Sequence, residues 1–427
     1  MRLLFLALSQ HGYGETVIGM SLARQLLPLG VECHFVIEAT AEPVVSHGGF
    51  GYTVLSESMG PLAGLVLDDV VAEFKPDALV LADYLIFSRA MRTLFLLDPW
   101  YIDRYQLPVL PIDIWGLDGE HLEMDFGGQE TIKLDPRIRQ LAGQLRPVPL
   151  THPQPAVGGR VFPFRLSDAD GRVSRRTRGH LHSTLGIPRG HRLAMITFAG
   201  WQRSPDPRYD ERIHRIAQRV PELLVHYLRA LPPTTHFMII GGMPDAFRAL
   251  PADRLITLPA CMPKRFAVLT GAADLLISLN AASTAVAEAI LADVPAVVLS
   301  NRFTVTEAGP DADGADGADG APQKVSEFVR TWLAGTGPVY PFRIWPLGYH
   351  RFLDPLLAGN PYTDTLATAE LLDEDGVMTV LEAALYDRAT RDSYARARAG
   401  YHRTVAALPG TCETFTRAAQ AAGLTVR

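Results

Sequence analysis

The chain has 427 residues, of which 48% are hydrophobic and 20% charged, and a formal net charge of −6. At roughly 150 residues per domain, this length predicts two or three domains, each with its own core. The composition excludes a disordered protein and a polybasic nucleic-acid binder. Cys33, Cys261 and Cys412 are too widely spaced for a zinc motif or a disulfide framework. With no signal peptide and no apolar stretch of about 18 residues, a cytoplasmic location is expected.

The first half alternates between strand-like and helix-like segments. The apolar run 2–8 leads through a glycine-rich loop to a helical pattern over 16–27. Further strand-like runs lie at 31–37, 52–55, 78–82 and 107–114, where the series closes, and helix-like segments at 41–47 and 61–74. This alternation predicts a parallel sheet wound on both faces, with ligands bound at the carboxyl ends of its strands.

Periodicity fades between 116 and 167, where proline and glycine accumulate, and a second alternating series follows. Its strand-like runs are 193–198, 236–240, 255–258, 275–278 and 296–299, and its helices are 174–185, 213–231, 264–271 and 283–291. We therefore predict two doubly wound domains, 1–165 and 166–372, followed by C-terminal helices over 373–427. The small polar repeat DADGADGADGAP predicts a mobile loop at 309–323.

The first post-strand loop, SQHGYGE at 9–15, is the first candidate site. Its glycines, Gly12 and Gly14, let the backbone approach a ligand closely, and Gly12, Tyr13 and Gly14 are candidates for binding an acceptor. Glu15 stands at the helix start, either as a catalytic base or only as a complement to the helix dipole. His11 is a second candidate base, or a residue that orders the loop.

A nicotinamide site is an alternative for the same loop. Gly12 and Gly14 begin the GxGxxG fingerprint, and Glu38 ends the second strand where a ribose-binding carboxylate would stand. Val17 occupies the place of the third glycine. The departure from the fingerprint disfavours an oxidoreductase.

The second candidate site is the segment ADLLISLNAASTAVAEAILADVPAVV at 273–298. A buried strand enters a loop of small residues, including Asn280 and Ala282, and then a helix whose first turn offers free amides and the hydroxyls of Ser283 and Thr284. This arrangement suits a diphosphate. Glu288, one turn beyond Thr284 on the same helix face, is placed to reach a ribose. The alternative is a βαβ unit that only packs.

This segment resembles the donor-binding segment of GT-B glycosyltransferases, which runs ADLVISxxGxxTxxEAxxxGVPxVxxP. The resemblance implies two facing Rossmann-like domains, with the acceptor in the first, the nucleotide sugar in the second, and the final helices crossing back onto the first. The chain departs from the family in two places. Leu279-Asn280-Ala281 replaces the His-Gly-Gly of many relatives, and no Asp-Gln or Glu-Gln pair occurs between 300 and 373.

The resemblance also bears on the first loop. Its Gly14-Glu15 pair is similar to that of the Kdo transferases, in which a Glu stands where other relatives carry a catalytic His. It implies an inverting mechanism, in which Glu15 takes the proton of the acceptor hydroxyl and helix amides, rather than a metal, stabilise the leaving diphosphate.

The same family geometry places three further loops on the donor side, and a fourth loop is a candidate from its own residues. In the loop with Gly200, Trp201 and Arg203, these residues are expected to contact the donor phosphates. Gly241 and Met262, each in a further loop, are expected to lie beside the base. Alternatively, Arg203 is simply solvated. The loop after the last strand of the first domain offers Asp113, Trp115 and His121 for a polar acceptor, or is an ordinary exposed loop.

Together these segments predict an inverting, metal-independent glycosyltransferase that moves a sugar from a nucleotide-diphosphate donor to a small soluble acceptor, such as an intermediate of secondary metabolism. No cofactor, nucleic acid or membrane partner is expected, and homo-oligomerisation stays open. Asp-Ala-Asp at 168–170 and 311–313 resembles metal-binding DxD, but its flanks are typical of turns, so no metal is expected. Alternatives are a nucleotide-sugar epimerase or hydrolase, which needs several acids and bases, and a non-catalytic partner protein.

Overall fold

The computed structural model describes residues 1–8, 12–116, 123–126, 130–133, 135–154, 159–167, 171–203, 205, 207, 209–311, 325–348 and 353–425. In the N-terminal domain five parallel strands form one sheet in the order β3-β2-β1-β4-β5. The strands are β1 (Arg2–Ala7), β2 (Glu32–Glu38), β3 (Gly51–Leu55), β4 (Ala78–Leu81) and β5 (Val109–Pro111). The helices that connect them are α1 (Gly14–Leu26), α2 (Glu42–Gly48), α3 (Ala63–Phe74) and α4 (Tyr84–Thr93).

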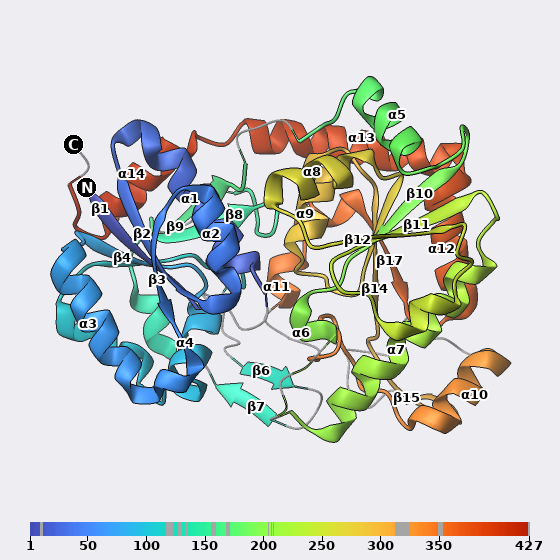
Figure 1. The fold of residues 1–427 in the computed structure, drawn as a ribbon, viewed down its shortest axis with the longest axis horizontal. Coiled ribbons are helices and arrows are strands. Elements are labelled where there is room, and N and C mark those ends of the chain that lie inside the picture. Colours follow the sequence, from blue (N-terminus) through green and yellow to red (C-terminus); the bar gives the residue numbers. More distant parts are fainter. Residues whose placement is uncertain are drawn as a thin grey trace.

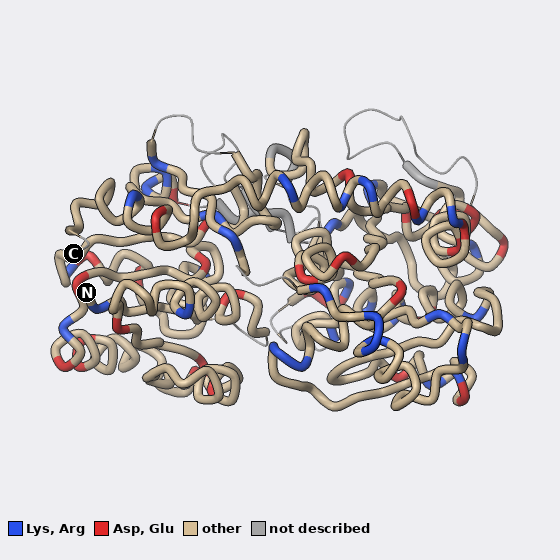
Figure 2. Tube along the Cα trace, turned by 90° about the horizontal axis from the view of Figure 1, so that it is seen from above, with Lys and Arg blue, Asp and Glu red and all other residues tan. Residues whose placement is uncertain are grey.

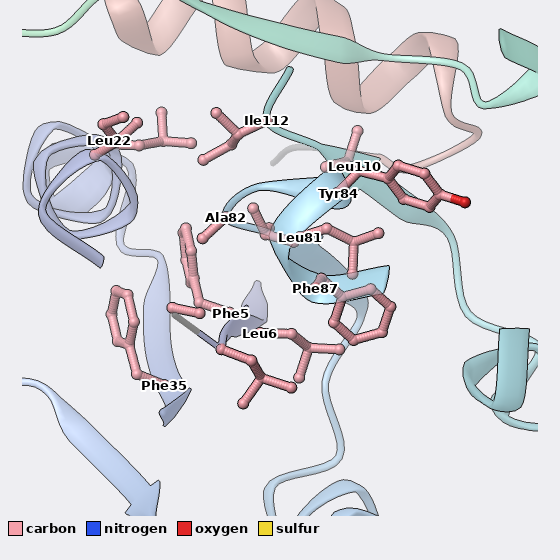
Figure 3. Close-up of a cluster of buried hydrophobic side chains, with 14 of the residues drawn as sticks. Phe5, Leu6, Leu22, Phe35, Leu81, Ala82, Tyr84, Phe87, Leu110 and Ile112 are labelled. Carbon is pink, nitrogen blue, oxygen red and sulfur yellow. The ribbon is translucent and has the colours of Figure 1, made fainter. Parts of the chain in front are cut away.

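The central strands of this sheet are apolar on both faces because helices cover both. Phe5 and Phe35, on neighbouring strands, stack with ring centroids 4.7 Å apart. Leu81 and Phe87 pack into the same buried cluster, which Figure 3 shows in close-up. Burial on both faces explains the continuous apolar runs from which the parallel sheet was predicted.

The C-terminal domain repeats this plan with six parallel strands in the order β12-β11-β10-β13-β14-β17. They are β10 (Arg192–Ile196), β11 (Thr235–Ile240), β12 (Leu255–Leu258), β13 (Leu275–Ser278), β14 (Ala296–Ser300) and β17 (Leu366–Glu370). The helices are α5 (Arg175–Thr184), α6 (Gly200–Arg203), α7 (Glu211–Ala230), α8 (Pro263–Ala272), α9 (Thr284–Leu291), α10 (Glu327–Thr336), α11 (Leu353–Leu357) and α12 (Glu374–Tyr386). The predicted α/β class with two doubly wound domains is confirmed.

The remaining elements are short. A parallel pair, β8 (Gln144–Val148) and β9 (Val161–Arg165), extends the N-terminal domain beside β5 through a bridge between Ile112 and Leu145. The five-stranded sheet itself ends with β5, as predicted for 107–114, while β8 and β9 form a separate two-stranded sheet that was not predicted. Two hairpins are β6 (Glu123–Phe126) with β7 (Glu130–Lys133), and β15 (Thr304–Thr306) with β16 (Gly309–Asp311). Turns of 3-10 helix lie at Leu27–Leu29, Ala39–Ala41, Glu57–Leu62, Pro99–Tyr105, Pro136–Gln140, Asp245–Ala249 and Thr363–Thr365.

The C-terminal helices join the two domains. In Figure 1, α13 (Arg388–Ala406) runs along the top from the C-terminal domain, and α14 (Thr411–Ala421) lies on the N-terminal domain. There Thr411 donates a hydrogen bond to the Gln25 side chain of α1 at 2.7 Å, and Phe415 is fully buried in the N-terminal core. Acidic and basic residues are interspersed over both domains (Figure 2). Within the described residues, no helix is long and apolar enough to cross a membrane.

Candidate active site

The order of strands fixes where a ligand can bind in each domain. In the N-terminal sheet the order reverses between β1 and β4, and in the C-terminal sheet between β10 and β13. Loops that leave the carboxyl ends of such strand pairs diverge to opposite faces of the sheet and leave a crevice between them. The loops that contain Glu15, Asp83, Gly200 and Ser283 are therefore the ones expected to form a site.

A cavity of about 1210 Å³ lies between the domains and is lined by these loops. In Figure 1, α1 and α2 of the N-terminal domain face α8 and α9 across it. The volume exceeds the roughly 300 to 1,000 Å³ typical of a single small-molecule site. It therefore leaves room for two substrates. The predicted site residues that line it are Gly12, Tyr13, Gly14, Glu15, Trp115, Gly200, Trp201, Arg203, Gly241, Met262, Asn280, Ala282, Ser283, Thr284 and Glu288.

The two domains approach each other at the starts of two helices. A Cβ atom placed on Gly14, the first residue of α1, would lie 3.7 Å from both Oγ1 and Cγ2 of Thr284, the first residue of α9. Helix starts carry unpaired N–H groups and a partial positive charge. The cavity is therefore bordered on both sides by groups that attract an anion.

Local hydrogen bonds fix the shape of the loop and of the first turn of α9 at the cavity wall. Ser283 caps the helix by accepting from the Ala285 N–H at 3.2 Å, and the Asn280 Oδ1 accepts from the Ala282 N–H at 2.9 Å. Asn280 thus shapes the loop through its carbonyl oxygen. One turn further on, burial raises the pKa of Glu288 to about 7. A buried carboxyl at the cavity wall is suited to accept hydrogen bonds from hydroxyl groups.

Arg203 lies on the side of the cavity formed by the C-terminal domain. A Cβ atom placed on Gly242 would lie 1.8 Å from the Arg203 Nη1, so the guanidinium rests on a glycine that leaves space for it. The preceding Gly241 has φ of 88°, a conformation that glycine adopts without strain. None of the ion pairs found between described residues includes Arg203. Its charge lies at the wall of the cavity, beside Gly200 and Trp201 of α6.

On the side of the cavity formed by the N-terminal domain, two buried carboxyl groups hold Trp115 in place. Its Nε1–H donates to Asp83 Oδ2 at 2.7 Å, and its backbone N–H donates to Asp113 Oδ1 at 3.0 Å. Arg146 of β8 pairs with Asp113 at 2.8 Å. Asp113 is 1% exposed and does not line the cavity. It therefore positions Trp115 and, contrary to the sequence-based expectation, is not placed to contact an acceptor.

Glu15 has two acidic neighbours at the carboxyl ends of adjacent strands. Burial, and next the negative charge of Glu15, raise the pKa of Asp83 well above its usual range. Burial, followed by the charges of Glu57 and Glu15, raises the pKa of Glu38 to about 7. Neither Asp83 nor Glu38 lines the cavity. Glu38 is thus not presented to a ribose in the cavity, which weakens the nicotinamide alternative.

Two predicted residues, His11 and His121, lie outside the described residues, as do the sequence 168–170 and most of the loop predicted at 309–323. Sequence reasoning missed three residues that matter. Asp83 directly follows a predicted strand, a signal that could have found it. Ile344 and Leu347 line the cavity but carry no sequence signal. Among the described residues, no group of three or more His, Cys, Asp or Glu side chains is arranged to hold a metal.

Solved structures share this fold. The spinosyn forosaminyltransferase SpnP is 14% identical, with 99% of each chain covered and a TM-score of 0.54. Anabaena Alr3699/HepE in complex with UDP is 12% identical, with 98% of this chain and 99% of that chain covered and a TM-score of 0.53. A putative UDP-N-acetylglucosamine 2-epimerase from Listeria monocytogenes is 13% identical, with 97% and 94% covered and a TM-score of 0.51. The arrangement of two Rossmann-like domains is the GT-B fold, as the resemblance implied.

Sequence comparison gives a family but no annotated relative. The model of a family of unknown function, DUF6365, matches residues 22–423. No curated protein matches the chain.

Proposed function

We propose that this chain, which belongs to DUF6365, a family of unknown function, is an inverting glycosyltransferase that uses a nucleotide-diphosphate sugar. The observation that carries the proposal is the meeting of the α1 and α9 starts across the cavity, with Gly14 opposite Thr284. One helix start offers amides to a diphosphate, and the other presents a carboxylate, Glu15, to the same space. The GT-B fold shared with SpnP and with HepE bound to UDP supports the assignment at the level of the fold.

The donor is proposed to occupy the C-terminal half of the cavity. The amides at the start of α9 and the Arg203 guanidinium bind the diphosphate, and Glu288 accepts hydrogen bonds from the ribose hydroxyls. Gly241 and Met262 border the base. Binding the diphosphate by amides and a guanidinium requires no metal in the leaving-group site.

Glu15 is proposed as the general base. Its carboxylate takes the proton from an acceptor hydroxyl while the hydroxyl oxygen attacks the anomeric carbon of the sugar. The bond between that carbon and the diphosphate oxygen breaks, and the pair of electrons leaves with the diphosphate, whose charge the start of α9 stabilises. Attack opposite to the leaving group inverts the anomeric configuration. A small acceptor would bind beside Gly12, Tyr13 and Trp115.

A nucleotide panel tests the assignment. UDP, dTDP or GDP should raise the melting temperature, because a ligand that binds the folded state stabilises it, whereas NAD and NADP should not. Cys261 lines the cavity, while Cys33 and Cys412 do not, so a bound nucleotide should slow alkylation of Cys261 alone. Stabilisation by NAD with no effect of the diphosphates would replace the proposal with an oxidoreductase.

An epimerase is the alternative that the Listeria neighbour raises. Epimerisation needs acids and bases on more than one side of the sugar. Of the described residues that line the cavity, only Glu15 and Glu288 carry carboxylates, and Glu288 lies one turn into α9. Incubation with UDP-N-acetylglucosamine decides the point, because an epimerase would yield the 2-epimer with no acceptor present.

A further inference from the structure

The wall beside the start of α9 comes from a segment far along the chain. The Ala281 N–H donates to the Arg343 carbonyl at 3.0 Å, and the Trp345 N–H donates to the Leu279 carbonyl at 3.0 Å. An antiparallel bridge joins Asn280 to Ile344. Residues 343–345 therefore run alongside the loop that leads into α9, and Ile344 lies next to the proposed diphosphate site.

Two polar side chains on this wall, Gln202 and Ser278, are engaged within the protein. Gln202 is 3% exposed, and its Oε1 accepts from the Ala199 N–H at 2.8 Å while its Nε2 donates to the Trp345 carbonyl at 2.9 Å. The Ser278 hydroxyl bonds to the backbone of Asn280 in both directions, at 3.1 and 3.2 Å. These groups hold the wall in shape, so their hydrogen-bonding capacity is not directed at a sugar.

The loop after β14 also turns its polar groups away from the cavity. The Asn301 side chain is 1% exposed and donates to the carbonyls of Phe303 and Tyr340 at 2.7 and 2.8 Å. Arg302 is held by Glu370 of β17. Of the described residues that follow β14, those that line the cavity are Ile344 and Leu347, both apolar.

We propose that the donor sugar is a deoxygenated hexose, with a deoxy position held against Ile344 and Leu347. The inference rests on the proposed function, since a sugar joined to a diphosphate at the start of α9 must lie beside this wall. A hydroxyl pressed against these two side chains loses its hydrogen bonds to water and gains none from them, whereas a methyl or methylene group gains apolar contact. The wall thus selects for the absence of a hydroxyl at one ring or exocyclic position.

Titration calorimetry tests this selection. The ligands are dTDP, dTDP-glucose and the 2-, 3-, 4- and 6-monodeoxy derivatives of dTDP-glucose. If UDP binds more tightly than dTDP, the corresponding uridine compounds are used instead. At least one monodeoxy derivative should bind about tenfold or more tightly than dTDP-glucose, within the range by which apolar pockets reject an added hydroxyl. In Leu347→Gln, where an amide replaces the half-buried leucine, the difference should shrink to about threefold or less because the added hydroxyl finds a partner. Leu65→Gln, at an exposed position on α3 outside the cavity, should leave it unchanged.

The outcomes separate the two proposals. If nucleotide diphosphates bind but glucose and every monodeoxy derivative bind equally well, the deoxy-sugar inference is wrong while the proposed function stands. A preference that persists unchanged in Leu347→Gln would likewise refute the role given to this wall. If no nucleotide diphosphate binds at all, the proposed function fails and the inference fails with it.

Discussion

Gly14 and Thr284 lie 270 positions apart in the chain and face each other at van der Waals distance, with 3.7 Å between a Cβ atom placed on Gly14 and the Thr284 hydroxyl oxygen. Each is the first residue of its helix. Because these two residues lie together, the positive ends of α1 and α9 border the same part of the cavity. There the partial positive charges of the two helix starts add. A small side chain at position 14 is what keeps that space open.

Substitution at Gly14 tests whether the space is used. Gly14→Ala adds a carbon at ordinary contact distance within a helix, so it should leave nucleotide affinity within about twofold and stability unchanged or slightly higher. Gly14→Leu places three further carbons toward Thr284 and should weaken binding of UDP or dTDP by at least about tenfold, while the protein stays folded by circular dichroism. Equal affinities of the two variants would show that the diphosphate binds elsewhere.

The raised pKa of Glu288 predicts a pH dependence of binding. Its pKa of about 7 means that the empty site holds the carboxyl partly protonated at neutral pH. If ribose hydroxyls donate to the carboxylate, binding favours the ionised form, so affinity should fall by up to roughly tenfold per pH unit below 7. In Glu288→Gln the affinity should not show this fall. Subtracting the pH profile of the variant from that of the wild type removes the effect of the nucleotide's own titration, which is the same for both proteins. Identical pH profiles would exclude Glu288 from the ribose site.

The same pKa also predicts a change in stability. A carboxyl whose folded-state pKa is raised stabilises the fold when protonated, and this contribution is lost as the pH rises from about 5 through 7. The melting temperature of the empty protein should therefore fall over that range. The melting temperature of Glu288→Gln should fall less over the same range. Part of the fall that remains in this variant is assigned to Glu38, whose pKa is also raised to about 7.

Arg203 and Gly242 should behave as one unit in binding. An alanine at position 242 would displace the guanidinium, because its Cβ would lie 1.8 Å from Nη1. Arg203→Ala should therefore weaken nucleotide binding by about 1.5 to 3 kcal/mol, the range of a charge-assisted hydrogen bond. Gly242→Ala should have a similar effect, and the double variant should be no worse than Arg203→Ala alone. No loss in Arg203→Ala would mean that Arg203 is solvated and does not bind the nucleotide, and additive losses would mean that position 242 acts independently of Arg203.

The attachment of α14 to the N-terminal domain predicts a stability effect far from the cavity. Phe415 is fully buried among N-terminal core residues, so Phe415→Ala should lower the free energy of unfolding by about 3 to 5 kcal/mol. Glu413→Ala, at an exposed position of the same helix, is the matched control. Urea denaturation measures both. A loss below 1 kcal/mol for Phe415→Ala would mean that α14 contributes little to the domain it covers.

Most strands that sequence reasoning found are apolar runs buried on both faces, such as β4 and β13, although it also found the edge strands β3 and β12. It missed β8 and β9, which contain Pro147 and Pro163, because proline usually argues against a strand and is tolerated only where its missing N–H is not needed. It also missed β17, an edge strand with the mixed sequence LATAE. Which neighbour such a short segment pairs with is a tertiary property that a local pattern does not record.

At the site, the order of strands explains what could be predicted. Glu15, Ser283 and Gly200 stand where the loop after a strand meets the next helix, so the rule for parallel sheets locates them from sequence. Asp113 also follows a strand, yet its carboxylate is taken by Arg146 from β8, an element that was not predicted. Ile344 reaches the cavity only because residues 343–345 pair with the loop before α9. That pairing joins segments more than 60 positions apart and leaves no periodic signal.

The most direct test of the central claim is the rate of sugar transfer by the wild type and by Glu15→Gln, measured by mass spectrometry with UDP- and dTDP-sugars and a set of hydroxylated small-molecule acceptors. We predict a product carrying one added sugar in the wild type, and a turnover about 10²- to 10⁴-fold lower in Glu15→Gln at unchanged nucleotide affinity. His11→Asn should cost less if that imidazole only orders the loop. Transfer by Glu15→Gln at the wild-type rate would contradict the account.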